Sequence, residues 1–181
     1  MDSSFIVHSH KKENLALNDA WIALGGNLGD VLSSFLSARQ SIMKLPYCEV
    51  LQSSKLYQTT AVGPKGQPDY LNAAIAIRTQ LEPFDLLQRL QEIENQHGRI
   101  RQEHWGARTL DLDILAYADM QSESNILCLP HKQLHLRQFV LRPLCDIAPT
   151  WQHPIIRKSA QELLQDLLNS GENALTTGSI W

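Results

Sequence analysis

The stretch "GPKGQPDYLNAAIAIRTQL", residues 63–81, decides the fold. Its first seven residues are dense in Gly and Pro, which predicts a loop. Residues 70–81 carry a long apolar run, which indicates a strand in the centre of a sheet. Residues 49–60, rich in β-forming residues, predict the strand before it. Because the loop between them is too short for a crossover helix, the two strands should pair antiparallel.

A strand–helix unit precedes this pair and a helix follows it. "WIAL" (21–24) predicts a short buried strand, and apolar residues at helical spacing predict a helix over about 30–45. Asp30 is placed to cap that helix. After the central strand, Pro83 suits the first turn of a second helix, which Gly98 ends.

The chain then predicts one more strand, residues 109–117, and a last helix, "AQELLQDLL". Ser159 and Glu162 form a capping box ahead of this helix. The order is therefore β-α-β-β-α-β followed by a helix. It predicts an α+β, ferredoxin-like fold: a single domain with a mainly antiparallel sheet and its helices on one face.

Composition narrows the function classes. The 181 residues carry a formal net charge of -3, so no nucleic-acid partner is expected. No apolar run is long enough for a bilayer, so no membrane partner is expected either. Three separated cysteines without a C-x-x-C pair favour a reducing, cytoplasmic location. Residues 1–20 are mostly polar and are expected to be a flexible extension, which leaves 21–181 as the domain.

The stretch "HWGARTLDLDIL" (104–115) carries the first chemical pattern. In a strand, Asp111 and Asp113 project from one face, while the leucines between and before them enter the core. Such a pair is either a polar strand face or a Mg²⁺ site, since Mg²⁺ prefers carboxylate oxygens and substrate phosphates. A basic cluster just upstream favours the metal–phosphate interpretation, because arginines hold the remaining phosphate charge. Its members are Arg99, Arg101, His104 and Arg108.

Other residues leave alternatives open. Trp105 is either a core residue or part of a loop that closes over a ligand. Tyr70 and Asn72 share one strand face, where they form either a structural contact or a platform for a flat heterocycle. His131 and His135 lack the motif of a zinc site and are interpreted as surface or phosphate-contacting side chains.

Together these motifs resemble the 6-hydroxymethyl-7,8-dihydropterin pyrophosphokinase (HPPK) family of folate biosynthesis, over about residues 21–154. "HWGARTLDLDIL" is similar to the family signature, and "TTAVGPKGQPDYLNAA" to its pterin-binding segment. "EIENQHGRIR" resembles its nucleotide-contacting helix end. The resemblance implies transfer of the terminal two phosphates of ATP to the pterin hydroxymethyl group, with release of AMP. It makes residues 21–181 the catalytic domain.

The resemblance also implies site residues by position. Asp111 and Asp113 would bind two Mg²⁺ ions, and Arg99 and Arg108 would be catalytic. The nucleotide-side positions are Gln91, Glu94, Arg101, Trp105, Ile114, His131 and Arg137. The pterin-side positions are Thr59, Ala61, Val62, Tyr70, Asn72 and Phe139. The chain would act as a monomer, and its partners would be the small molecules ATP and the pterin.

Some positions depart from the family pattern. "TTAVG" replaces a proline-rich form, and His104 stands where an arginine is common. Cys128 and Lys132 replace a threonine and a tyrosine near the nucleotide, which predicts altered nucleotide affinity. Two other functions compete: a Mg²⁺-dependent nucleotide-sugar transferase, which would need a larger domain with a parallel sheet, and a ferredoxin-like ligand-binding domain, which leaves the arginine–aspartate block unexplained.

Overall fold

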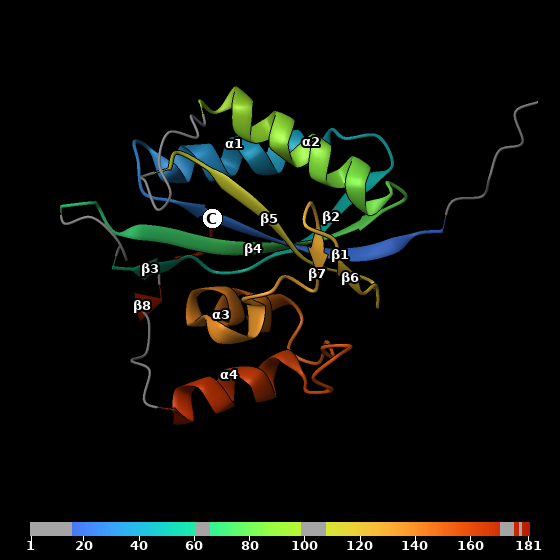
Figure 1. Cartoon of the computed structure of the whole chain (residues 1–181). Coiled ribbons are helices and arrows are strands. Elements are labelled where there is room, and N and C mark those ends of the chain that lie inside the picture. The colour runs from blue at the N-terminus through green and yellow to red at the C-terminus, as the bar shows by residue number, and fades with distance from the viewer. Residues whose placement is uncertain (1–15, 61–65, 99–107, 171–175, 178) are drawn as a thin grey trace, which may run out of the picture.

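The computed structural model describes residues 16–60, 66–98, 108–170, 176–177 and 179–181. Its framework is a sheet in the order β5-β1-β4-β3-β8, with β2 also paired to β4 (Figure 1). A small second sheet pairs β6 with β7. The strands are β1 (Asn18–Gly26), β2 (Cys48–Ser53), β3 (Tyr57–Thr59), β4 (Tyr70–Thr79), β5 (Asp111–Tyr117), β6 (Ser122–Glu123), β7 (Cys128–Leu129) and β8 (Thr176–Thr177).

The central position predicted for residues 70–81 is confirmed. Strand β4 lies between β1 and the pair β2 and β3, and every pairing of the main sheet in the described part of the chain is antiparallel. This arrangement is the antiparallel ferredoxin-like order that the short loop and the β-α-β-β-α-β pattern predicted. It argues against the nucleotide-sugar transferase, which needed a parallel sheet.

Helices cover both faces of the sheet (Figure 1). Helices α1 (Val31–Met43) and α2 (Pro83–Gln96) lie on one face, as expected. Helices α3 (Gln138–Ile147) and α4 (Ala160–Asn169) lie on the other, after a short 3₁₀ helix, η1 (Leu134–Leu136). The expectation of helices on one face only was wrong. Both faces of the central strands are apolar, and each needs a covering layer.

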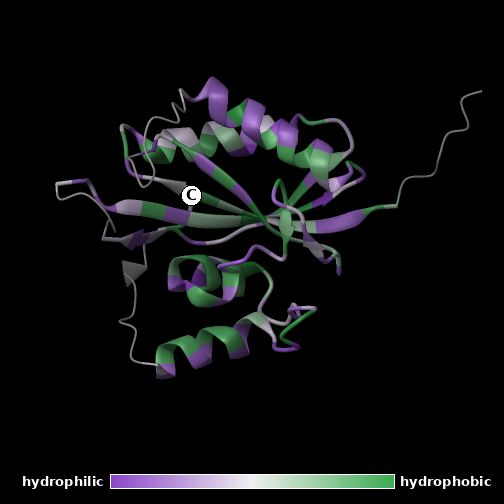
Figure 2. Cartoon of the chain, viewed as in Figure 1, coloured by the Kyte–Doolittle hydropathy of each residue, from purple (hydrophilic) through white to green (hydrophobic). Residues whose placement is uncertain are grey.

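Each side of the sheet has its own hydrophobic cluster. The helices that cover the sheet carry both hydrophobic and hydrophilic residues (Figure 2). The larger cluster includes Ile22, Phe35, Ile75, Leu90 and Leu112, from the sheet and helices α1 and α2. The smaller includes Leu115, Leu134, Leu141, Trp151 and Leu163, from β5 and the α3–α4 side. Strand β5 therefore contributes to both clusters.

The predicted helix boundaries rest on the expected caps. Asp30 Oδ1 accepts a hydrogen bond from the Ser33 N–H at 3.0 Å, and Ser159 and Glu162 form a complete capping box. Pro83 occupies the first turn of α2, and Gly98, just beyond its end, has a φ of 73°. These local signals fix where the helices begin and end.

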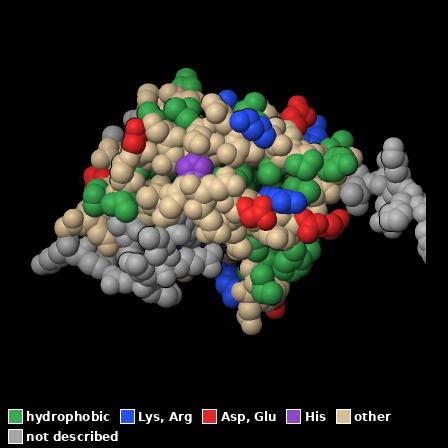
Figure 3. Space-filling view, turned by 90° about the horizontal axis from the view of Figure 1, so that it is seen from above, with side chains coloured by type: hydrophobic (Ala, Val, Ile, Leu, Met, Phe, Trp, Pro, Cys, Tyr) green, Lys and Arg blue, Asp and Glu red, His purple; other side chains and the backbone are tan. Residues whose placement is uncertain are grey.

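The face formed by α1 and α2 mixes hydrophobic, charged and polar side chains (Figure 3). Single exposed leucines there, such as Leu32 and Leu36, are ordinary for a protein surface. Among the residues that the structure describes, none of the helices combines the length and apolar character needed to cross a bilayer.

Candidate active site

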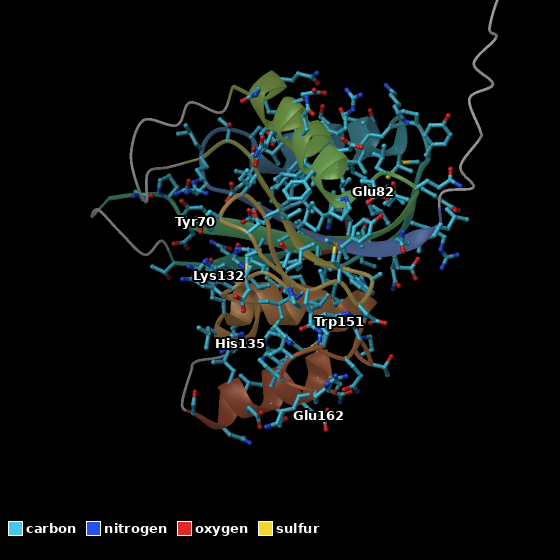
Figure 4. All side chains as sticks on the ribbon, turned by 45° about the vertical axis from the view of Figure 1, so that its right-hand side comes forward. Tyr70, Glu82, Lys132, His135, Trp151 and Glu162 are labelled. Carbon is cyan, nitrogen blue, oxygen red and sulfur yellow. The ribbon has the colours of Figure 1, made fainter. Side chains whose placement is uncertain are left out.

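A cavity of about 810 Å³ lies at one end of the main sheet, on the face covered by α3. Its floor comes from β1, β4 and β5, and its walls come from β3, Leu87 of α2, the segment 124–133 and the start of α3. Tyr70 and Lys132 lie at this end of the sheet (Figure 4). The cavity is large enough for more than one small ligand.

Gly25 divides the floor of this cavity. It pairs with Asn72 on β4 and with Asp111 on β5, so it separates the predicted pterin and metal residues. Two strand spacings put their backbones about 10 Å apart. A Cβ on Gly25 would lie 3.9 Å from both the Asn72 Oδ1 and the Asp111 Cβ. The absent side chain therefore keeps the space between the two groups open.

The predicted phosphate side is an acidic pair with one arginine. Asp111 and Asp113 both line the cavity, as the alternation of β5 predicted. Arg108 also lines it, and its Nη1 lies 2.5 Å from the Asp111 Oδ2. Asp111 is half-buried and Asp113 is exposed. Two carboxylates that open onto a cavity fit Mg²⁺, which completes its coordination with water and substrate phosphates.

The predicted pterin side is an oriented amide beside two aromatic rings. The Asn72 Nδ2 donates to the Thr59 Oγ1 at 3.0 Å and to the Tyr57 carbonyl at 3.4 Å. These bonds fix which edge of the amide faces the cavity. Tyr70 and Phe139 line the same cavity. Burial raises the pKa of the Tyr70 hydroxyl, so this group remains a neutral hydrogen-bonding phenol near pH 7.

The predicted nucleotide side follows the outer edge of β5. The His131 N–H donates to the Leu115 carbonyl at 2.8 Å, which ties the segment 128–133 to that strand. Burial lowers the pKa of His131, partly offset by the nearby Asp113 charge. The guanidinium carbon of Arg137 lies 5.4 Å from the centre of the Phe139 ring. The side chains of His131, Arg137 and Ile114 all line the cavity.

The cavity thus brings together ten of the predicted site residues. They are Thr59, Tyr70, Asn72, Arg108, Asp111, Asp113, Ile114, His131, Arg137 and Phe139. The other predicted residues Arg99, Arg101, Trp105, Ala61 and Val62 lie outside the described residues.

Gln91 and Glu94 lie on α2 and are not among the cavity-lining residues. Glu94 is 1% exposed, and its Oε1 accepts the Leu112 N–H at 2.6 Å. The carboxylate thereby holds β5 at the residue between the two aspartates. Its predicted contact with the nucleotide stays a prediction.

The sequence did not single out Gly25, Thr60, Asn125 or Gln133 as site residues, and all four line the cavity. Gly25 stands in "GGNLG", which the sequence indicated only as a strand–turn–helix connection. The β1–β4 register alone reveals its place beside Asn72. Cys128 and Lys132 line the cavity as well, which is consistent with the nucleotide-side position predicted for them.

Comparisons with known proteins agree with this arrangement. The family model of 7,8-dihydro-6-hydroxymethylpterin-pyrophosphokinase (HPPK) matches residues 21–149. A 2-amino-4-hydroxy-6-hydroxymethyldihydropteridine pyrophosphokinase from Synechocystis sp. is 43% identical over 148 residues, 82% of this chain and 75% of that protein. The protein of the same name from Haemophilus influenzae is 43% identical over 129 residues, 71% of this chain and 81% of that protein.

Solved structures show the same fold. The wild-type HPPK-DHPS of Plasmodium falciparum, crystallised with pterin and p-hydroxybenzoate, superposes with a TM-score of 0.69 at 15% identity. The superposition covers 87% of this chain but 44% of that longer chain. From the family match and the curated relatives, the chain belongs to the HPPK family.

Proposed function

We propose that the chain transfers the terminal diphosphate of ATP to the hydroxymethyl group of 6-hydroxymethyl-7,8-dihydropterin. The products are the pterin diphosphate and AMP, and the reaction is a step of tetrahydrofolate biosynthesis. Family membership supports the reaction. The observation that carries it to this chain is the single cavity lined by Asn72 and Tyr70 on one side and by Asp111, Asp113 and Arg108 on the other.

In this reaction the hydroxymethyl oxygen attacks the β-phosphorus of ATP. A new O–P bond forms, the bond from the β-phosphorus to the α,β-bridging oxygen breaks, and AMP leaves with that oxygen. The hydroxyl proton goes to solvent. Phosphoryl transfer of this kind needs mainly alignment and charge neutralisation from the protein.

The position of each residue in the cavity indicates its proposed role in alignment or charge neutralisation. Asn72, with its amide fixed by Thr59, would read the edge of the pterin ring. Tyr70 and Phe139 would enclose the faces of the ring. Asp111 and Asp113 would hold two Mg²⁺ ions, which supply positive charge to the phosphate oxygens. Arg108 would neutralise charge on the phosphates as AMP leaves, together with Arg99.

The remaining residues would bind the nucleotide. Those on the described part of the chain are Gln91, Glu94, Ile114, His131 and Arg137. Arg101 and Trp105 complete the set, and Ala61 and Val62 the pterin pocket. We further propose that residues 21–181 form the catalytic domain, with residues 1–20 as an extension, and that the enzyme acts as a monomer in the cytoplasm.

An AMP assay tests the proposed function. The protein is incubated with ATP and Mg²⁺, with and without 6-hydroxymethyl-7,8-dihydropterin, and AMP and the pterin diphosphate are quantified by chromatography. We expect equal amounts of both products, and only when the pterin is present. AMP that forms without the pterin, or none with it, would contradict the proposal.

A further inference from the structure

Asn27 lies in the turn between β1 and α1 and is 3% exposed, although it is polar. It is not a cavity-lining residue. The turn runs very close to the backbone that precedes β5. A Cβ on the neighbouring Gly26 would lie 2.8 Å from the Thr109 carbonyl oxygen, so only glycine fits there. This close approach brings the Asn27 side chain within reach of other segments.

The Asn27 amide forms hydrogen bonds with two such segments. Its Nδ2 donates to the Gln67 Oε1 at 3.2 Å and to the Pro68 carbonyl at 3.1 Å. Its Oδ1 accepts the Arg108 N–H at 2.9 Å. The backbone N–H of Asn27 also donates to the Arg108 carbonyl at 2.9 Å. Both the donor and the acceptor of the amide are therefore used, and Asn27 binds both the backbone N–H and the backbone carbonyl of Arg108.

The two segments belong to opposite halves of the candidate site. Gln67 and Pro68 directly precede the start of β4, where Tyr70 lines the pterin side. Arg108 carries the ion pair with Asp111 on the phosphate side. One buried amide thus connects the backbone of both halves at the end of the sheet.

We propose that Asn27 is a positioning residue that couples the pterin half of the site to the phosphate half. This inference rests on the proposed function. The attacking oxygen and the β-phosphorus come from different ligands, each held by its own half. A relative displacement of about 1 Å between the halves costs an in-line transfer on the order of 100-fold in rate.

The arrangement requires asparagine. One group must donate two hydrogen bonds toward Gln67 and Pro68 while it accepts one from Arg108. Aspartate has the same shape and keeps the acceptor, but it has no donor and sets a charge against two oxygens. Asn27→Asp therefore breaks only the connection to the pterin half.

Kinetics of Asn27→Asp give the first test. We expect kcat to fall about 100-fold, while the dissociation constant of each ligand measured alone changes less than threefold. Gln67→Leu removes one of the two acceptors without altering Asn27 and should lower kcat about fivefold. Asn18→Asp is the matched control: Asn18 is a half-buried asparagine at the other end of β1, outside the cavity lining, and the kcat of its variant should equal that of the wild type. A kcat of Asn27→Asp within threefold of wild type would overturn the proposal.

Ligand coupling gives a second test, which needs no turnover. Calorimetry measures the affinity for the pterin with and without saturating Mg²⁺ and α,β-methylene-ATP, whose α–β linkage cannot be cleaved. Because ordering one half assists the other, the analogue should tighten pterin binding at least fivefold in the wild type and less than twofold in Asn27→Asp. Equal coupling in both proteins would refute the role of Asn27, whether or not the wild type forms AMP.

Discussion

Asp113 offers the cleanest residue-scale test of the metal proposal. It is exposed to the cavity, whereas Asp111 is half-buried and paired with Arg108. Asp113→Asn removes one charge without disturbing that pair. We expect the rate of AMP formation to fall about 10²- to 10³-fold, the loss that follows removal of one charge-stabilising group. Mn²⁺ binding followed by electron paramagnetic resonance should weaken in parallel.

Asp119→Asn is the matched control, because Asp119 is an exposed aspartate just beyond the far end of β5. Both variants should keep the thermal stability of the wild type. Unchanged turnover and Mn²⁺ binding in Asp113→Asn would mean that the two aspartates are only the polar face of a strand.

At the residue scale, alternation along a strand was enough to predict part of the site. The period of two correctly put Asp111 and Asp113 on one face of β5, and Tyr70 and Asn72 on one face of β4. This period could not predict that Gly25 lies between Asn72 and Asp111, because strand register depends on pairing between distant segments. The link through Asn27 depends on the same long-range pairing.

At the element scale, local signals predicted three helices: the side-chain caps Asp30 and Ser159 for α1 and α4, and Pro83 in the first turn of α2. Helix α3 was missed: it contains Pro143 and has no side-chain cap, so its sequence lacks the usual helix signals. Residues 49–60, predicted as one strand, form β2 and β3. Between them the Ser54 Oγ accepts the Ala74 N–H at 2.8 Å, so a side chain replaces the backbone acceptor there.

The segment between α3 and α4 carries a pH-sensitive packing element. The His153 Nδ1 lies 3.3 and 3.2 Å from the backbone nitrogens of Ile155 and Ile156. It can accept hydrogen bonds from these N–H groups only when Nδ1 is unprotonated. The His153 ring packs against the rings of Trp151 and His135, two residues on the α3–α4 side of the sheet (Figure 4). Burial, and then the charge of His135, lower the pKa of His153 below 6.5.

This lowered pKa predicts a loss of stability in mild acid. Below pH 6.5 the unfolded chain takes up the proton before the folded chain, so the free energy of unfolding falls from pH 6.5 down to the folded-state pKa. In His153→Asn, an amide oxygen can accept the same N–H groups but does not titrate. Urea unfolding at pH 7.5 and 5.5 should show a smaller pH dependence for this variant. If the wild type and His153→Asn show the same pH dependence of unfolding, that dependence comes from other groups, such as His131.

At the scale of the whole molecule, residues 176–177 and 179–181 link the edge of the sheet to the layer that contains α1. Strand β8 pairs with β3, whose last residue, Thr59, lines the cavity. Beyond β8, the Trp181 Nε1 donates to the Ser54 carbonyl at 3.0 Å. The Trp181 ring lies 5.8 Å from the Phe35 ring of α1. Because α4 lies on the opposite face of the sheet, the end of the chain crosses the β3 edge to reach α1 (Figure 1).

Replacing Trp181 tests whether this crossing supports the site. Trp181→Ala removes a half-buried ring and its hydrogen bond, which should lower the free energy of unfolding by about 2 kcal/mol and the Tm by about 4–8 °C. Ile180→Ala is the control, since Ile180 is 86% exposed and should have almost no effect. Because β3 carries Thr59, the affinity for the pterin should fall more than the affinity for ATP. An equal loss for both ligands would show that the crossing stabilises the fold without a particular effect on the pterin side.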